Sequence, residues 1–329
     1  MITGQIIERM RSGNRFMLTS HRKPDGDSIG SEMAMALILE RLGKVAVVRN
    51  RDAYPSAYRR LPGIERILTG ELPEGEQYDA VFTMECTEIE RPGLARIGDY
   101  FIINIDHHHN NTMFGALNWV DIGACAVGEM IFDLAREMKL DLTTEIATHL
   151  YVSIATDTGF FHFSNTTART FEICAELARL GANPNFVADC LYDHNRPGQI
   201  QLLGKTLSRL EIDWEMRTAT IALFQSDFDG IDAVDGDTEG IINYPRSIDG
   251  VDVAVFFKEA GTRSFRVGLR ARKDLNVAEV AAEFGGGGHP QASGCTIEGE
   301  YEEVRGKLFA ALRRKLQARS SAAWTADGR

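Results

Sequence analysis

The stretch that decides the fold is "RFMLTSHRKPDGDSIGSEMAMALILERLG", residues 15–43. Its first six residues form an apolar run with the length of a buried strand, and the residues from Asp27 onward carry apolar side chains at helical spacing up to Gly43. Between them, His21, Asp25 and Asp27 place an imidazole and two carboxylates in one short loop. A strand, a polar loop and a helix in this order predict one unit of an α/β sheet.

The first half of the chain repeats this alternation. Further strands are expected at residues 44–49, 79–84 and 100–105, and helices at residues 126–139, 143–158 and 167–182. Strands that alternate with helical or mixed segments are typical of a parallel sheet with helices on its faces. The fold class predicted for this half is therefore α/β with a mostly parallel sheet.

The second half reads as a separate and smaller α+β unit. A turn-rich stretch at 181–199 and a connecting helix at 200–212 precede strands at 218–224, 251–257 and 264–271. A short helix at 276–284 leads into "GGGGHPQASG", and an amphipathic helix at 301–319 closes the unit. We therefore predict a first domain at 1–185, a connecting segment at 186–213, a second domain at 214–319 and a disordered tail at 320–329.

Composition excludes several functional classes for this chain of 329 residues. A net charge of −11 argues against a broad binding face for long duplex nucleic acid, which needs basic side chains. Five scattered cysteines without a CxxC pair predict neither a disulfide framework nor a zinc knuckle. The apolar runs are too short to cross a membrane, and the N-terminal residues lack the apolar segment of a secretory signal. These features predict a soluble cytoplasmic protein without a membrane partner.

Polar groups follow the strands of the first half at the point where each strand ends. Besides the loop at 21–27, Glu85 follows the strand at 79–84, and Asp106, His107 and His108 follow the strand at 100–105. Asp157 ends a long apolar helical run, where a lone buried carboxylate would be costly. Ligands of parallel sheets bind outside the carboxyl ends of the strands. Carboxylates and imidazoles without a thiolate suit manganese or magnesium, and about six ligands fit two ions that share a carboxylate.

Each element also has a simpler interpretation. The "PDGD" segment is a good turn in which Asp27 could cap the following helix, and "HHH" at 107–109 could be a surface loop. Glu32 and Glu40 in the first helix are expected to face solvent. The joint occurrence of acidic and histidine groups at several ends on one sheet edge favours the metal site over these separate interpretations.

Four segments resemble the signature regions of the DHH phosphoesterases. They are "HRKPDGDSIGS", "IDHHHNN", "ATDTGFF" and "GGGGHPQASG", which occur in the family's order and span nearly the whole chain. More narrowly, they resemble the NrnA-type enzymes with their DHH-associated C-terminal domain. The resemblance implies a two-metal hydrolase, with Mn²⁺ as the expected ion and Mg²⁺ as the alternative, that cuts very short oligoribonucleotides or dephosphorylates pAp.

The resemblance also implies roles for individual residues. His21 and Asp25 match ligands of one metal, whereas Asp27, His107 and Asp157 match ligands of the other. His108 matches a residue that contacts substrate and assists the leaving group, with Asp106 orienting an imidazole. The family places a bridging aspartate where this chain has Glu85. A longer side chain leaves two alternatives, a retained ligand with a shifted backbone or a weakened second site.

The C-terminal domain is implied to hold the substrate. Gly286, Gly287, Gly288 and His289 match a loop that grips the terminal phosphate or base, and Arg270 matches an anion-binding arginine. Glycines allow backbone N–H groups to approach phosphate oxygens closely. The alternative for the glycine run is a flexible linker. A Walker-type loop is excluded because neither Lys-Ser nor Lys-Thr follows the glycines.

Several functions stay open at this point. Hydrolysis of a cyclic dinucleotide or of pApA by an enzyme of the same family cannot be separated from the oligoribonuclease interpretation. A nucleotide-binding homologue with a metal site impaired at Glu85 is an alternative from a different class. An inorganic pyrophosphatase would carry a lysine- and arginine-rich signature instead of "GGGGH", and a long single-strand exonuclease would need a longer chain and a basic channel. Whether the chain forms a homodimer is also open.

Overall fold

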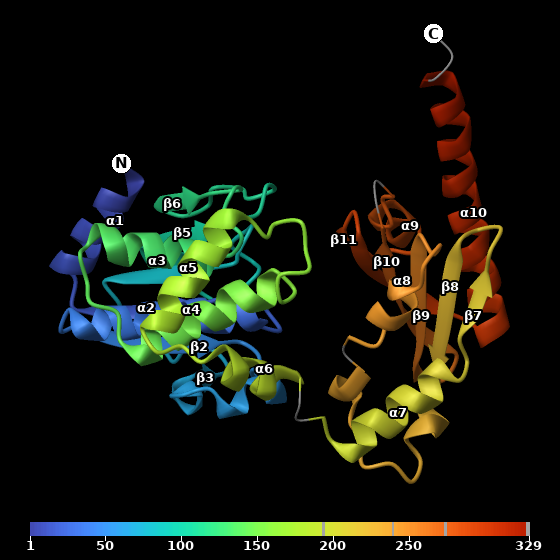
Figure 1. Cartoon of the computed structure of the whole chain (residues 1–329), viewed down its shortest axis with the longest axis horizontal. Coiled ribbons are helices and arrows are strands. Elements are labelled where there is room, and N and C mark those ends of the chain that lie inside the picture. The colour runs from blue at the N-terminus through green and yellow to red at the C-terminus, as the bar shows by residue number, and fades with distance from the viewer. Residues whose placement is uncertain (193–194, 239, 273–274, 327–329) are drawn as a thin grey trace. The chain divides into compact units, whose positions relative to one another are not determined.

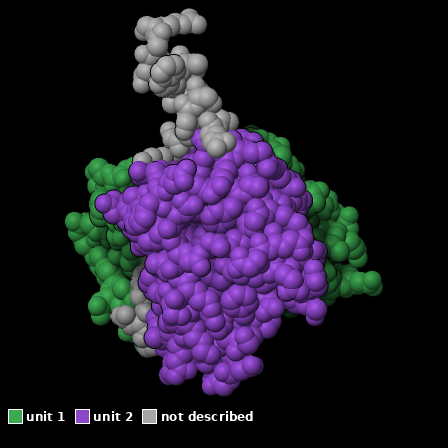
Figure 2. Space-filling model, turned by 90° about the vertical axis from the view of Figure 1, so that its right-hand side faces the viewer, with its two compact units in different colours: residues 1–194 green, residues 195–329 purple. Residues whose placement is uncertain are grey.

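The chain divides into two compact units, Met1–His194 and Asn195–Arg329, which are coloured separately in Figure 2. The computed structural model describes residues 1–192, 195–238, 240–272 and 275–326, with side chains described except at residues 192, 289 and 317–326. Each unit has its own sheet and its own buried core. The two units are therefore described one at a time.

A parallel six-stranded sheet forms the centre of the first unit (Figure 1). The strand order is β3-β2-β1-β4-β5-β6, and every neighbouring pair is parallel. The strands are β1 Arg15–Thr19, β2 Val45–Asn50, β3 Leu68–Thr69, β4 Ala80–Met84, β5 Ile102–Asp106 and β6 Leu117–Val120. The predicted α/β class is confirmed. Because β1, β4 and β5 are adjacent and parallel, the residues that follow them meet at one edge of the sheet.

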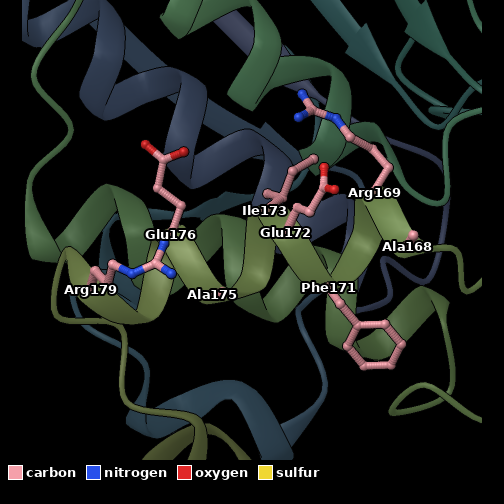
Figure 3. Close-up of a pocket in the computed structure, with 8 residues that line it drawn as sticks. All are labelled: Ala168, Arg169, Phe171, Glu172, Ile173, Ala175, Glu176 and Arg179. Carbon is pink, nitrogen blue, oxygen red and sulfur yellow. The ribbon is translucent and has the colours of Figure 1, made fainter.

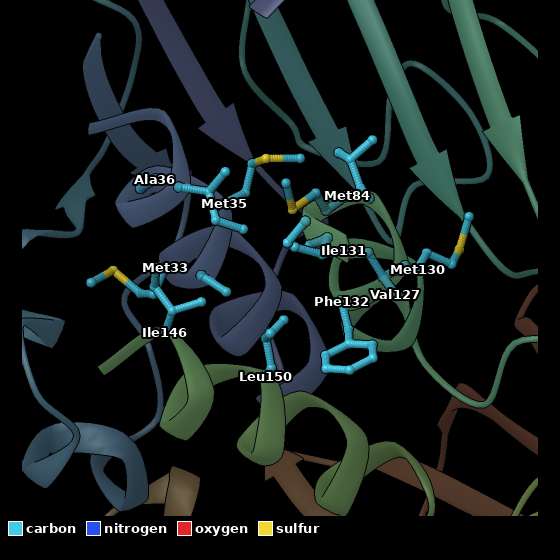
Figure 4. Close-up of a cluster of buried hydrophobic side chains, with 14 of the residues drawn as sticks. Met33, Met35, Ala36, Met84, Val127, Met130, Ile131, Phe132, Ile146 and Leu150 are labelled. Atoms are coloured by element: carbon cyan, nitrogen blue, oxygen red, sulfur yellow. The ribbon is translucent and has the colours of Figure 1, made fainter. Parts of the chain in front are cut away.

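Helices cover this sheet and build the main core with it. They are α1 Ile2–Ser12, α2 Gly26–Arg41, α3 Val127–Glu137, α4 Thr144–Asp157, α5 Ala168–Arg179 and α6 Pro184–Tyr192, with short 3₁₀ turns at Ser56–Arg60, Ile64–Arg66 and Ile97–Asp99. Figure 4 shows Met33 of α2 beside Ile146 of α4, and Phe132 of α3 near Leu150 of α4, all in one buried cluster. Nearly every side chain of α2 is buried, since it packs between the sheet and neighbouring helices. The helix that carries Asp27 is thus fixed on several sides.

The second unit is built on a mixed six-stranded sheet. Its order is β11-β12-β10-β9-β8-β7, in which β8 and β9 are parallel and the other pairs antiparallel. The strands are β7 Glu211–Asp213, β8 Thr218–Leu223, β9 Val253–Gly261, β10 Ser264–Ala271, β11 Gly287–His289 and β12 Ala292–Glu298. The helices are α7 Pro197–Leu207, α8 Asn243–Ser247, α9 Ala278–Ala282 and α10 Tyr301–Ala326, with 3₁₀ turns at Gln225–Phe228 and Asp235–Thr238.

Two observations bear on the expected boundaries. Leu202 of α7 is fully buried in one cluster with Ile221 and Leu223, so this helix belongs to the core of the second unit. The last helix continues to Ala326 and thereby includes part of the segment for which a disordered tail is expected, while residues 327–329 lie outside the described residues. All five cysteines are free and buried. Among the described residues, none of the helices combines the length and apolar character that a membrane crossing needs.

Candidate metal centre

The end of β1 and the start of α2 carry the first set of polar groups. Asp25 is the N-cap of α2, and its Oδ1 accepts a hydrogen bond from the Ser28 backbone at 3.0 Å. The His21 Nδ1 lies 2.8 Å from the Arg22 carbonyl oxygen, while its Nε2 lies 3.1 Å from Ser28 Oγ and 3.6 Å from Asp25 Oδ2. When Nδ1 donates its N–H, the lone pair that a metal would use is on Nε2. The capping residue is therefore Asp25, not Asp27.

Asp27 is held from three sides in the first turn of α2. Its Oδ1 accepts hydrogen bonds from Ser31 Oγ at 2.8 Å and from Ser153 Oγ at 2.5 Å. Its Oδ2 accepts the backbone N–H of Val127 at 2.8 Å, at the start of α3. The side chain is only 1% exposed. These contacts and the positive ends of two helices hold the carboxylate in one position.

His107 lies at the centre of the acidic groups. Its Nδ1 is 3.0 Å from the Ala124 carbonyl oxygen, so Nδ1 donates and Nε2 faces the carboxylates. Nε2 lies 3.4 Å from Glu85 Oε1, 3.7 Å from Asp157 Oδ2 and 4.0 Å from Asp27 Oδ2. Two sets of residues each bring their ligand atoms within 4.8 Å of one another. One set is Glu85, His107 and His108, and the other is Asp27, His107 and Asp157. His21 and Asp25 lie outside both groups.

Glu85 has an unusual backbone for its residue type. Its φ of 60° is in the left-handed region, which costs a non-glycine residue on the order of 1–2 kcal/mol. The side chain is 2% exposed, and within the described part of the chain its Oε1 is buried without a hydrogen-bond partner. Its Oε2 lies 3.9 Å from His108 Nδ1. A buried carboxylate oxygen that accepts no hydrogen bond and lies beside two imidazoles is a group that a cation would stabilise.

The converging acidic groups raise the pKa values of several members of the cluster. Burial, followed by repulsion from Asp27, raises the pKa of Glu85 well above its usual range, and the same two causes raise the pKa of Asp157 to about 7. Burial alone would lower the pKa of His107, but the contact with Glu85 and the charges of Asp27 and Asp157 raise it to about 11. Protons are held where several carboxylates converge, and a divalent ion can replace them.

Asp106 orients His108 at the end of β5. Its Oδ1 lies 2.7 Å from His108 Nδ1 and accepts the backbone N–H groups of His107 and His108, while its Oδ2 accepts from Asn111 Nδ2 at 2.5 Å. Burial favours the neutral acid, yet the hydrogen bonds from His108 and Asn111 lower the pKa of Asp106 below its usual value. The His108 side chain is 26% exposed. The contact with Asp106 orients this partly exposed ring through its Nδ1.

The glycine run of the second unit is part of a hairpin. Gly287–His289 form β11, which pairs with β12 through Gly287 opposite Gly294 and His289 opposite Ala292. The space available for a side chain differs between Gly286 and Gly287. At Gly286 a Cβ would lie 2.2 Å from the Gly294 carbonyl oxygen, whereas at Gly287 it would meet no described atom within 4 Å. The glycine at 286 is explained by packing and the one at 287 is not.

The other groups expected to hold substrate lie on neighbouring elements. Arg270 on β10 is partly buried, and its Nη1 donates to the Leu269 carbonyl oxygen at 3.1 Å. Burial and the nearby charge of Arg246 lower the pKa of Arg270. A Cβ at Gly288 would lie 2.5 Å from the Ala292 carbonyl oxygen, so this glycine is also required by the hairpin. The side chain of His289 lies outside the described residues.

Comparison with known proteins decides the family. Residues 15–154 match the DHH family, N-terminal domain, and residues 220–318 match the DHHA1 domain. Over 307 residues the chain is 31% identical to the bifunctional oligoribonuclease and PAP phosphatase NrnA of Thermus thermophilus, covering 91% of this chain and 89% of that protein. This chain belongs to the DHH family.

Solved structures share the fold of this chain. An exopolyphosphatase-related protein from Bacteroides fragilis superposes with a TM-score of 0.90 at 25% identity, covering 96% of this chain and 97% of that one. The structure of RecJ in complex with Mn²⁺ from Thermus thermophilus gives a TM-score of 0.54 at 12% identity, covering 95% of this chain and 54% of RecJ. The second likeness shows the fold alone.

Sequence reasoning missed several groups that support the site of the DHH domain. Asn165 Nδ2 lies 3.2 Å from Asp157 Oδ2 and 2.9 Å from the Cys125 carbonyl oxygen, and it thereby ties the end of α4 to the start of α3. Ser153 bridges Asp27 and the backbone of Gly128. Asn111, which donates a hydrogen bond to Asp106, could have been found from the sequence, since it lies in the "HHHNN" segment beside the predicted ligands. The others are single polar residues with no sequence pattern.

The expectation that Glu32 faces solvent is wrong. This side chain of α2 is fully buried, because α2 packs between the sheet and α4 and presents almost no face to water.

A shallow hollow along the outside of α5 carries no ligand group of the cluster (Figure 3). Two of its charged residues are in ion pairs, Arg169 with Asp133 and Glu176 with Arg136. It is therefore a surface feature separate from the candidate metal centre.

Proposed function

We propose that this DHH protein is a two-metal phosphoesterase that degrades very short oligoribonucleotides to mononucleotides and dephosphorylates pAp. The observation that carries this proposal is the convergence of Asp27, Glu85 and Asp157 on Nε2 of His107, at the carboxyl edge of the sheet. It occurs in a chain that is similar along most of its length to a relative named as oligoribonuclease and PAP phosphatase.

The donor set fits two hard divalent ions. Asp27, His107 and Asp157 would hold one ion, His21 and Asp25 would contribute to the other, and Glu85 would lie between them. Oxygen and imidazole donors without thiolate favour Mn²⁺ or Mg²⁺, and we propose Mn²⁺, the ion named in the RecJ structure. Bound there, the ions would supply an activated water at neutral pH and neutralise charge on the phosphoryl oxygens.

The residues of the chain have complementary tasks. Asp106 holds Nδ1 of His108, so that Nε2 can hydrogen bond to the leaving oxygen and pass a proton to it. The contacts from Ser31, Ser153 and the Val127 backbone fix Asp27 before any ligand binds. In the DHHA1 domain, Arg270 and the hairpin at 286–289 would bind the nucleotide phosphate or base.

We place the enzyme in the cytoplasm, because five buried cysteines without a disulfide suit a reducing compartment. The substrates are expected to be small nucleotides such as pAp, pApA and oligoribonucleotides of a few residues. Long duplex nucleic acid is an unsuitable substrate for a chain of net charge −11.

A hydrolysis panel tests the function directly. The purified chain is assayed with Mn²⁺ against a short RNA, pAp, pApA and a cyclic dinucleotide, beside its Asp157→Asn variant. Asp157 is 28% exposed and accepts a hydrogen bond from Asn165, so the amide preserves shape while removing charge. We expect turnover of the short RNA and of pAp that the variant loses by at least about 100-fold. Nucleotide binding without turnover would instead indicate a sensor with an impaired metal site.

A further inference from the structure

A buried carboxyl group lies behind the metal centre without a role in the mechanism above. Glu32 of α2 is fully buried, and its Oε2 accepts a hydrogen bond from Asn50 Nδ2 at 2.8 Å. Its Oε1 has no hydrogen-bond partner among the described residues. Burial raises the pKa of Glu32 to about 7. Replacing such a group by a well-packed apolar residue is often neutral or stabilising, so stability gives no reason for its presence.

Asn50 connects this carboxyl group to the strand end that precedes the first metal ligand. It is the last residue of β2 and is fully buried. The parallel ladder between β1 and β2 has its last partners at Leu18 and Val48. Beyond it, the Asn50 side chain bonds the chain that follows β1. Its Oδ1 accepts the backbone N–H of Ser20 at 3.0 Å and lies 3.3 Å from Thr19 Oγ1.

The two ends of the Asn50 amide have different partners. Oδ1 faces donors of β1 and the following residue, while Nδ2 faces the carboxylate of Glu32. Glu32 Oε2 accepts from Nδ2, and this hydrogen bond sets the direction of the amide. An apolar residue at position 32 would leave Nδ2 unpaired in the core, and the amide could rotate away from the Ser20 backbone.

We propose that Glu32 and Asn50 are positioning residues that fix Ser20 and, through it, the ring of His21 for metal binding. His21 directly follows Ser20, and its Nε2 lies 3.6 Å from Asp25 Oδ2. A displacement of the His21 ring by a few tenths of an ångström would matter, because metal–ligand distances tolerate only about 0.2 Å. This inference rests on the proposed metal centre and adds to it a pair of residues that touch neither ion nor substrate.

The test measures Mn²⁺ binding to metal-free protein by calorimetry, beside thermal unfolding. Glu32→Leu and Asn50→Leu are expected to weaken binding of one ion by roughly 10- to 100-fold, the range for groups that orient metal ligands. Glu32→Gln can still accept the Asn50 hydrogen bond and is expected to stay within about threefold of the parent. His149→Leu is the matched control, since His149 is fully buried, bonds the Pro62 carbonyl oxygen and should leave Mn²⁺ affinity unchanged.

A double-mutant cycle separates positioning from general damage. If Glu32 acts through His21, adding Glu32→Leu to His21→Ala should cause little further loss of Mn²⁺ affinity. Parent-like Mn²⁺ binding by Glu32→Leu, or an equal loss in Glu32→Gln, overturns the positioning role while the metal centre stands. Absence of Mn²⁺ binding by the parent protein overturns the metal centre itself, and the positioning role with it.

Discussion

Glu85 Oε1 lies 3.4 Å from Nε2 of His107, and this carboxylate oxygen is buried without a hydrogen-bond partner in the described part of the chain. The contact joins the ends of β4 and β5, which are neighbours in the sheet. It is made from a left-handed backbone at Glu85. Glu85 thus keeps its carboxylate within reach of the histidine.

Removing the charge of Glu85 tests whether this carboxylate is a ligand. Glu85→Gln is expected to reduce Mn²⁺-dependent turnover by roughly 100-fold, because a neutral amide cannot balance a divalent ion in a buried site. Rates are measured across a Mn²⁺ titration with a short RNA. Glu129→Gln is the control, since Glu129 is also buried in this unit and bonds the Cys125 backbone outside both ligand groups.

Glu85→Asp distinguishes the two alternatives left by the sequence. Aspartate tolerates a left-handed backbone at least as well as glutamate, so the fold should be unaffected. If the left-handed backbone already places the glutamate well, the aspartate variant should stay within about tenfold of the parent in the same titration. A large gain in turnover or in Mn²⁺ affinity would show instead that Glu85 weakens the second site.

The pair of Asp106 and His108 predicts an effect on turnover without an effect on metal binding. In Asp106→Asn the charge that fixes His108 Nδ1 is lost, so kcat for the short RNA is expected to fall roughly 10- to 100-fold. The Mn²⁺ concentration for half-maximal rate should change less than about threefold. His109→Ala is the control in the same triplet, because His109 is exposed and should be silent. An equal loss in both variants would exclude a special role for Asp106.

How much the sequence predicts depends on what a pattern can report. The strand ends that carry His21, Glu85 and His107 follow from apolar runs, because parallel strands bring their carboxyl ends to one edge. Leu117–Val120 is half-buried at the sheet edge and mixes polar with apolar residues, so β6 has no such signal. The prediction that Glu32 is exposed was wrong because helical periodicity assumes one solvated face, and α2 has almost none. Side-chain contacts such as that of Asn165 with Asp157 require the fold itself.

Glu32 also predicts a pH dependence of stability. Burial raises its pKa from 4.5 to about 7, so the folded chain holds a proton that the unfolded chain releases between these values. The favourable contribution of the protonated group is present below pH 4.5 and is lost as pH rises through 7. Relative to Glu32→Gln, the parent should lose up to roughly 3 kcal/mol across this window, since one pKa unit is worth about 1.4 kcal/mol. Denaturant unfolding with a chelator at pH 4 to 8.5 measures it, and parallel curves would contradict it.

The glycine hairpin of the DHHA1 domain allows a substrate role to be separated from packing. At Gly287 a methyl group meets no described atom within 4 Å, so Gly287→Ala should leave unfolding unchanged. If backbone N–H groups of this strand approach a nucleotide phosphate, the same methyl group should raise KM for short RNA by roughly tenfold with little change in kcat. Gly286→Ala should instead lower stability, because its Cβ would lie 2.2 Å from the Gly294 carbonyl oxygen. An unaltered KM in Gly287→Ala would remove the hairpin from the substrate site.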